Sequence, residues 1–504
     1  MSLFSGSNIS ELFVGESKIG SVFVGENCVY QSKYEIPIEE DNGDEYFYFR
    51  VHDKRETAQV GFERKTYEFH PSTATTIPEI NYSSFTTYVA PTFEYSYDKV
   101  TWNPYTLGTL LSIGNGQVAN KVYFRGDNLA PWYDEYQQTT THTNDSNEEV
   151  TDTHTFRINT HVIINNAQVQ CNGNIMSLRY KNYQNQLTIP CDYAFAFLFG
   201  QCSMLLRSPV LQATTLTEAC YIGMFYKCTS LQLCPILPAT IMQKGCYAGM
   251  FYECTSITIP PALPSTNLAV GCYGNTHVPY DDGGYGALIK DQTYSTYLLE
   301  YYGMFAYCTH LKQAPVLPAT TLQKGCYSQM FNSCFELQEF PTLSATTLAE
   351  DCYSGMFKFC RAATIPPELP ATTLVDSCYE GMFAYSGIIK TPKLPATTIV
   401  PGCYGDWVGI GGMFQGCLHL QSITTLPALE IGTTYAYYGM FKLSNVKASA
   451  TQTTECKYAY RVPTSGTGSA DSKSLTDMFT DASDTTKNFT PSVNTTFYIN
   501  VPSF

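Results

Sequence analysis

One phrase of six residues, Cys-Tyr-x-x-Met-Phe, recurs through the second half of the chain and limits the folds that it can adopt. Neighbouring copies are 26 residues apart, as from Met224 to Met250. A fixed period of this length is typical of repeat proteins, in which each copy buries its apolar side against the next copy. The period therefore predicts a solenoid that begins near Leu187. The clearest copies occupy 220–225, 246–251, 326–331, 352–357 and 378–383.

A second phrase, Leu-Pro-Ala-Thr-Thr-Leu, separates the copies, for example at Leu317–Leu322. Each turn is expected to contain a short helix or turn over the first phrase, and a short strand after it. Two columns of Cys run in register with the repeat, and we interpret them as buried small hydrophobes with free thiols. Neighbouring turns would be close enough for an occasional disulfide. The columns are Cys220, Cys246, Cys272, Cys326, Cys352, Cys378 and Cys403, and Cys202, Cys228, Cys254, Cys308, Cys334, Cys360 and Cys417.

The period is broken most strongly between Cys272 and Met304, where 28 extra residues enter the repeat. Insertions in solenoids form loops on one face, often the binding face. This insertion, 275–302, combines Tyr rings with carboxylates, which suits stacking on a sugar or contact with a protein. Ligand binding, contact with another subunit and packing on the solenoid itself are all open for it. The candidate binding residues are Tyr280, Asp281, Asp282, Tyr285, Tyr294 and Tyr297.

The N-terminal residues hold a repeat of their own, in which Leu12–Ile19 is echoed by Val22–Val29. Short β-rich runs broken by Gly-Glu turns predict two small hairpins, which are too short to bury a core alone. They either attach the chain to another protein or form a strand pair of the following domain. The candidate anchoring residues are Phe13, Val14, Gly15, Phe23, Val24 and Gly25.

These patterns together predict a mainly β protein with short helices, in which β-rich N-terminal domains precede a leucine-rich-repeat solenoid. The expected segments are 1–32 (anchoring hairpins), 33–78 (a β-rich domain), 79–182 (a β-sandwich-like domain), 183–459 (the solenoid, with its insertion at 275–302) and 460–504 (a C-terminal cap that lacks the Cys columns).

Several motifs that suggest chemistry have simpler interpretations. Gly114–Ala119 fits the G-x-G-x-x-A dinucleotide pattern, but a strand follows it where that pattern needs a helix. Asp41–Asp44 is typical of a turn and lacks the later ligands of a calcium loop. His142, His154 and His161 lie near one another in sequence, but nothing fixes a common geometry. No catalytic motif, metal site or cofactor is therefore expected, and we predict a protein that is not an enzyme.

The net charge of −15 and the low share of charged residues, 14%, argue against a nucleic-acid partner. No run of apolar residues is long enough to insert into a membrane. Residues 1–10 lack the basic and apolar segments of a secretion signal. We therefore expect the chain to be made in a cytosol, and to leave it by lysis or inside a particle.

The repeat phrase resembles the BspA-like leucine-rich repeats, which occur in surface and phage-encoded proteins of gut Bacteroidota. The front unit, from Phe93–Asp98 through Tyr123–Gly126 to Gly173–Leu178, is similar to the domain that often precedes those repeats. Residues 1–32 resemble short modules near the ends of phage tail and fibre proteins, with Glu where Asp is usual. The resemblance covers about 80–504, and implies adhesion without conserved chemistry. The long insertion and the missing secretion signal depart from exported adhesins.

The sequence thus favours a non-enzymatic structural protein of a bacteriophage virion, assembled in the host cytoplasm, that acts as a fibre or tail-associated adhesin. Its expected partners are other virion proteins through residues 1–32, and a glycan or protein of the host surface. A homo-oligomer, with a trimer as the guess, is implied only by analogy with fibres. The alternative is a bacterial cell-surface adhesin with BspA-like repeats.

Overall fold

The computed structural model shows a mainly β protein, with 3% of residues helical and 25% in strands. For the strands within residues 12–31, and for residues 69, 480, 481 and 484–487, only the backbone is described. The described residues are 12–14, 17–19, 21–24, 27–31, 38, 41, 43–69, 77–144, 148–274, 303–405, 411–428, 431, 435–463, 473–481 and 484–504.

The first strands form two separate antiparallel hairpins. In the first, β1 (Leu12–Val14) pairs with β2 (Ser17–Ile19), and in the second, β3 (Ser21–Val24) pairs with β4 (Asn27–Gln31). The two hairpins predicted from the internal repeat are therefore present. Neither hairpin shares a sheet with another described strand.

The front unit of the protein contains two sheets. One has the strand order β14-β13-β5-β10-β7-β8 and the other β11-β12-β6-β9, so β5 and β6 lie inside sheets whose other strands come from after residue 92. Segments 33–78 and 79–182, which we expected as two domains, thus share both sheets. The strands are β5 Tyr48–Val51, β6 Thr57–Phe69, β7 Phe93–Ser96, β8 Asn103–Tyr105, β9 Leu111–Gly114, β10 Lys121–Gly126, β11 Tyr133–Thr143, β12 Glu149–Asn165, β13 Val169–Asn172 and β14 Leu205–Arg207. Three short 3-10 helices lie between them, at Tyr82–Ser84, Ile175–Leu178 and Tyr183–Asn185.

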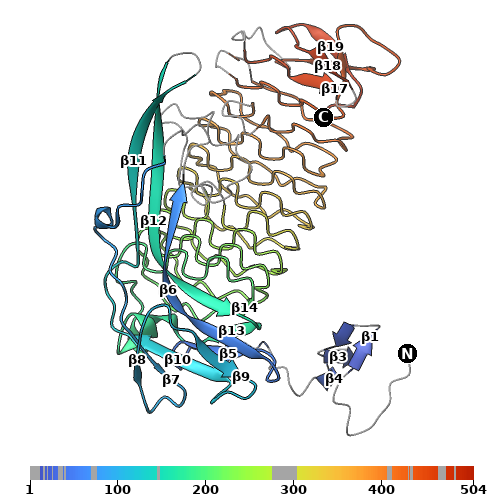
Figure 1. Cartoon of the computed structure of the whole chain (residues 1–504). Coiled ribbons are helices and arrows are strands. Elements are labelled where there is room, and N and C mark those ends of the chain that lie inside the picture. Colours follow the sequence, from blue (N-terminus) through green and yellow to red (C-terminus); the bar gives the residue numbers. More distant parts are fainter. Residues whose placement is uncertain are drawn as a thin grey trace.

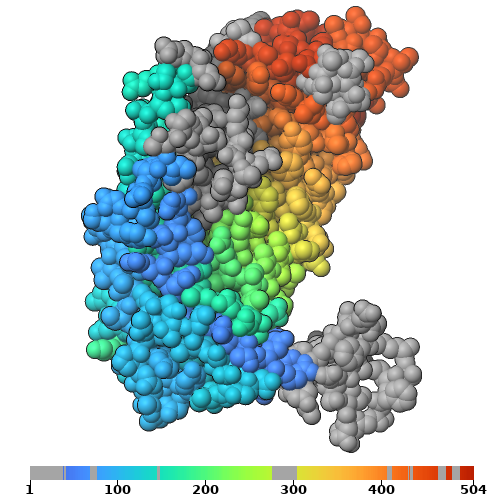
Figure 2. Space-filling view, viewed as in Figure 1, coloured from blue at the N-terminus to red at the C-terminus, as the bar shows by residue number. Residues whose placement is uncertain are grey.

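The rest of the chain forms a stack of turns, which we call the repeat stack (residues 187–479). The long hairpin β11–β12 extends alongside this stack in Figure 1. In Figure 2 the front unit, blue to cyan, abuts the green first turns. β14 belongs to the start of the stack, and its parallel pairing with β13 continues the front sheet into it.

Hydrogen bonds show how the first phrase of the repeat folds. The N–H groups of Tyr221, Gly223 and Phe225 donate to carbonyls of the next turn, while that of Met224 donates to the carbonyl of Tyr221 at 3.2 Å. Every fourth residue adopts a left-handed conformation, with φ of 48° at Ala219, 56° at Gly223 and 56° at Lys227. An α-helix cannot include such residues. Within the described part of the stack, the helix considered for this phrase is accordingly replaced by consecutive turns. The strand expected after it forms in the first turn, as β14 after Cys202, and in later described turns isolated bridges are found, such as Ile241 with Asn267.

Two ladders of aromatic rings run through the core of the stack. The Phe rings stack with centroids 5.3 to 6.1 Å apart, and the Tyr rings, which begin with Phe195, with centroids 5.6 to 6.0 Å apart. Offset stacking of this kind is favourable beyond simple burial. Each repeat therefore contributes the same two rings to one continuous core. The ladders comprise Phe199, Phe225, Phe251, Phe305, Phe331, Phe357, Phe383, Phe414, Phe441 and Phe479, and Phe195, Tyr221, Tyr247, Tyr273, Tyr327, Tyr353, Tyr379, Tyr404 and Tyr437.

The two Cys columns differ in their hydrogen bonds. In the second column the thiol donates to the carbonyl of a Phe in the preceding turn, as from Cys334 Sγ to Phe305 O at 3.2 Å. In the first column no described thiol donates to a carbonyl; Cys246 Sγ lies 3.8 Å from the sulfur of Met242. All eighteen Cys whose side chains are described are free. Burial raises the pKa of these column thiols, so they remain protonated hydrophobes.

The C-terminal residues continue and then close the stack. Phe479 stacks on Phe441 at 5.3 Å, so the ladder extends two turns beyond that of Cys417, the last Cys of the two columns. A three-stranded sheet of order β15-β19-β16 follows the last turns. The strands are β15 Ala448–Ser449, β16 Tyr458–Arg461, β17 Phe479–Asp481, β18 Asp484–Phe489 and β19 Thr496–Ile499.

Candidate functional site

The residues predicted from sequence as functional are not brought together by the described structure. The candidate binding residues, Tyr280, Asp281, Asp282, Tyr285, Tyr294 and Tyr297, lie outside the described residues. Of the candidate anchoring residues, Phe13 and Val14 lie in β1, and Phe23 and Val24 in β3, where only the backbone is described; Gly15 and Gly25 lie outside the described residues. The two groups therefore stay predictions, and the site is sought where the insertion leaves the stack.

The turn that carries the long insertion closes as if nothing had been inserted. Met304 N–H donates to Tyr273 O at 2.7 Å, which is the bond that Met224 makes to Tyr221 in an uninterrupted turn. Gly274 and Gly303 border the insertion. A Cβ on Gly274 would lie 2.1 Å from Gly325 O, and one on Gly303 would lie 2.2 Å from Met330 Cα. Only glycine allows the chain to leave and return so close to the next turn.

The shorter insertion leaves the stack at the same place in the repeat. Met413 N–H donates to Tyr404 O at 2.9 Å and closes that turn in the same way. A Cβ on Gly405 would lie 1.8 Å from Tyr435 O, so this exit also requires glycine. These two insertions therefore emerge at one column, directly after the Tyr of the first phrase. A third interruption, between Met440 and Met478, follows Phe441 instead.

This column belongs to a face of the stack that we call the cover face. It consists of three columns: the residue before the first Cys, the residue after the Tyr, and the residue after the Phe. In the first turns these residues are apolar and buried, and pack with Tyr133 of β11 into a second hydrophobic cluster. The cluster comprises Tyr133, Ala196, Phe197, Ala219, Ile222, Tyr226, Ala248, Tyr252 and Ala306.

The front unit is fastened to the beginning of the cover face by aromatic and charged contacts. Tyr133 stacks on Tyr193 with ring centroids 4.7 Å apart. The guanidinium of Arg157 on β12 lies 4.8 Å from the centroid of Phe197, and also pairs with Glu135 at 3.2 Å. These contacts position β11–β12 over the first turns, on the face from which both insertions leave.

A fully buried arginine joins the front unit to the first ring of the Tyr ladder, Phe195. The guanidinium of Arg179 lies 3.4 Å from the centroid of Trp132 and 4.9 Å from that of Phe195. It donates to the backbone carbonyls of Ala130, at 2.7 Å, and Ala194. Burial lowers the pKa of Arg179 to about 9, which still leaves it charged at neutral pH. The unit and the stack are thus held together by a rigid donor fork.

Beyond these turns the cover face becomes polar. Asp351 and Ser354 occupy two of its columns in one turn, and Ser377 and Glu380 occupy the same columns in the next. All four are buried, with 6%, 0%, 1% and 0% of the side chain exposed. Three of their atoms, Asp351 Oδ2, Ser354 Oγ and Ser377 Oγ, are buried without a hydrogen-bond partner. Unpartnered buried polar atoms are rare in proteins and call for an explanation.

The electrostatic surroundings of Asp351 are acidic. Burial raises the pKa of its carboxyl to about 7, and the negative charges of Glu350 and Asp376 act in the same direction, while Lys324 opposes them. Lys324 itself pairs with Glu350 at 3.1 Å. We call Asp351, Ser354 and Ser377 the polar cluster; it combines burial, orphaned oxygens and a carboxyl with a raised pKa on the cover face.

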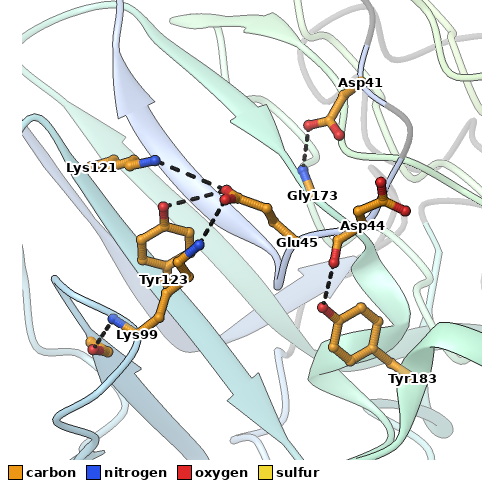
Figure 3. A network of polar contacts seen from close by, with 9 residues as sticks. Asp41, Asp44, Glu45, Lys99, Lys121, Tyr123, Gly173 and Tyr183 are labelled. Atoms are coloured by element: carbon orange, nitrogen blue, oxygen red, sulfur yellow. Dashed lines mark hydrogen bonds and ion pairs between the residues drawn. The ribbon is translucent and has the colours of Figure 1, made fainter.

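A second polar network, in the front unit, is structural. Figure 3 shows it around the loop that precedes β5. Asp41 Oδ2 accepts from Gly173 N at 2.8 Å, and Glu45 pairs with Lys99 at 2.8 Å and accepts from Tyr123 Oη at 3.3 Å. These carboxylates are occupied in fastening the loop to the sheet, and a calcium ion would have to displace those partners.

The histidines noted in the sequence lie along β11 and β12 without forming a common site. His142 Nδ1 is 2.8 Å from Asp152 Oδ2, and His154 Nε2 is 2.7 Å from Thr140 Oγ1. Burial lowers the pKa of His161 to about 3, so that ring is neutral. Across the residues that the structure describes, no group of three His, Cys, Asp or Glu could hold a metal ion.

Sequence reasoning missed the polar cluster. The only signal was a change of residue type within one column, in which Gly245, Gly271 and Gly325 are followed by Asp351 and Ser377. Nothing in the sequence indicated that these side chains would be buried.

Comparison with family models, with curated proteins and with solved structures gave no match. No described helix has the length and apolar character needed to cross a bilayer.

Proposed function

We propose that this chain is a non-enzymatic adhesin of a bacteriophage virion, a fibre or tail-associated protein that binds a glycan or protein on the host surface. The repeat stack would be a leucine-rich-repeat solenoid of the BspA-like kind. It would act as a rigid scaffold, and the cover face would be the side presented to the host.

One observation carries the binding role. The insertions at 275–302 and 406–410 leave the stack at the same column, through glycine exits that preserve the closing hydrogen bond of the turn. A rigid scaffold with loops gathered on one face is the usual architecture of binding proteins. The third interruption, between Met440 and Met478, lies at the C-terminal end of the stack and does not bear on the binding role.

The virion location rests on the hairpins β1–β2 and β3–β4, whose sequence resembles modules of phage fibres. Their strands share no sheet with the other described strands, which suits a role in attachment to another protein. Multiple weak contacts from several copies would then combine through effective concentration. The second candidate is a bacterial cell-surface adhesin, supported by the resemblance of the repeats to exported proteins.

Two experiments test the proposal. Mass spectrometry and imaging of purified virions should find the chain in the particle, and its absence would rule out the virion role. Fluorescently labelled full-length chain should bind host cells and be displaced by unlabelled chain, whereas a chain without residues 275–302 and 406–410 should bind them much less. Equal binding by the shortened chain would move the binding role away from the cover face.

A further inference from the structure

The polar cluster occupies columns that the same protein elsewhere fills with apolar residues or glycine. Where β11–β12 covers the stack, these columns hold residues such as Ala219, Ile222 and Ala248, which need no polar partner. Three to four turns beyond Ala248, Asp351, Ser354 and Ser377 are equally buried but polar. Apolar side chains at these positions would preserve the fold, so the polar ones point to a role other than packing.

The backbone holds the three side chains in adjacent positions on this face. Ser354 N–H donates to Asp351 O at 3.1 Å within one turn, and Asp351 N–H donates to Asp376 O at 3.2 Å in the next, directly before Ser377. The left-handed backbone at Asp351 and Ser377, with φ of 54° and 50°, repeats the conformation of the glycines in the same column. Polar side chains are therefore placed where the three preceding turns carry glycine, at Gly245, Gly271 and Gly325.

We propose that the polar cluster binds a primary ammonium group. Its three unpartnered oxygens, Asp351 Oδ2, Ser354 Oγ and Ser377 Oγ, match in number the three N–H donors of an ammonium. The inference deepens the proposed function, on which it rests, by naming the chemistry that the cover face recognises. The ammonium would belong to an amino sugar or to a lysine side chain of the host surface.

The chemistry of the cluster selects against other ligands. An anion would be repelled by Asp351, with Glu350 and Asp376 close by. A divalent metal prefers several charged or carbonyl oxygens, and among the described residues no group of three His, Cys, Asp or Glu could hold a metal ion. An ammonium takes one charge-assisted bond and two neutral bonds, which is the set available.

Binding should weaken in acid. An ammonium favours the ionised carboxyl of Asp351, whose pKa is raised by burial, and further by Glu350 and Asp376, against the opposing charge of Lys324. Glu380 and the protonated thiols of Cys352 and Cys378 complete the neighbourhood. Below about pH 7 the dissociation constant should rise about tenfold per pH unit, because a proton then competes with the ligand.

The test uses the full-length chain and matched pairs of ligands, incubated to equilibrium because the site is buried. Glucosamine is compared with N-acetylglucosamine, and a blocked lysine amide with its Nε-acetylated form, by thermal shift and calorimetry at pH 8. The free amine of at least one pair should bind and raise Tm, and its acetylated partner should not. The pair that responds identifies the source of the ammonium.

Glycine in the same column supplies a variant that is expected to fold. Asp351→Gly introduces the residue type found at Gly325 and Gly402, which stand in the same column with a similar positive φ. The variant should weaken amine binding about ten- to hundredfold, which corresponds to the loss of one charged hydrogen bond. The matched control is Asp376→Asn, an exposed neighbouring acid, which should retain binding. Unchanged binding by Asp351→Gly, or no amine binding by the wild type, overturns the proposal.

The outcomes for this site and for the proposed function can be told apart. If host-cell binding persists in Asp351→Gly while amine binding is lost, the ammonium site stands but is not the host contact. If cells do not bind the wild type and amines do, the adhesin role fails and the ammonium site stands.

Discussion

The two Cys columns predict opposite responses to the same pair of substitutions. At Cys334, in the second column, the thiol donates to Phe305 O, so Ser should be tolerated better than Ala. At Cys352, in the first column, no donation to a carbonyl is described, so Ala should be tolerated better than Ser. The chain already carries Ser386 and Ser444 in the second column, and Ala194 and Ala436 in the first. Ser474 also stands in the first column, where its hydroxyl has an acceptor of its own, Ile431 O at 3.0 Å.

The expected loss of stability in each variant follows from the burial of the thiol and from the hydrogen bonds that remain after the substitution. Both thiols are fully buried, so either truncation to Ala leaves a small cavity that costs about 1 kcal/mol. Cys334→Ala also removes one of the two donors to Phe305 O, which keeps the backbone N–H of Cys308 at 3.1 Å, and the lost bond adds about 0.5 to 1 kcal/mol. Cys334→Ser keeps a donor. Cys352→Ser instead buries a hydroxyl without an acceptor, at about 2 kcal/mol.

The assay is urea unfolding of the four variants under reducing conditions, followed by circular dichroism and compared through the midpoints. Repeat stacks need not unfold in two states, so the order of the variants is the criterion rather than an extrapolated free energy. The order should be Ser above Ala for Cys334, and Ala above Ser for Cys352. The same order at both positions would refute the assignment of the second column as hydrogen-bond donors.

Three further predictions concern the cover face. Asp351→Asn should remove a pH dependence of stability. Because burial raises the pKa of Asp351 to about 7 in the folded state, the wild type loses stability as pH rises from about 4 through 7, by at most about 4 kcal/mol. The difference in Tm between the variant and the wild type should therefore widen over that range. A chain that lacks residues 275–302, with Gly274 joined to Gly303, should keep the repeat stack folded, and loss of the cooperative transition would show that the segment is core. Gly405→Ala should lower Tm by several degrees, because its Cβ would meet Tyr435 O at 1.8 Å, whereas Ser354→Ala in the same column should change it little.

The repeat could be predicted from sequence because its physical requirements are visible in residue types. A Phe or Tyr that must stack on its copy in the next turn cannot vary, so both ladders appear as strict columns at a period of 26. The same reasoning placed the Cys columns in the core and the insertions in loops. The expectation that 33–78 and 79–182 form two domains was wrong, because local sequence does not show that β5 and β6 pair with strands that come much later in the chain.

The turn conformation was not predictable, because its left-handed residues are of many types. Gly223 carries the expected signature, but Ala219, Lys227 and Glu253 adopt the same conformation with side chains that disfavour it. Hydrogen bonds to the next turn compensate for this strain, and they exist only once the copies are stacked. The helix considered for the phrase reflects local propensity, which the contacts between turns override. The burial of Asp351 could not be predicted from sequence either, because it too depends on contacts between stacked turns.

The position of both insertions follows from the geometry of one turn. The bond from Met N–H to Tyr O closes a loop of two residues in ordinary copies, and the same bond closes a loop of 30 residues at 274–303 and of eight at 405–412. Since the entropy of closing a loop grows only with the logarithm of its length, the longer loops cost about 2 and 1 kcal/mol. Each column of the core keeps its residues in register. At this column the stack can thus accept new sequence without rebuilding a turn.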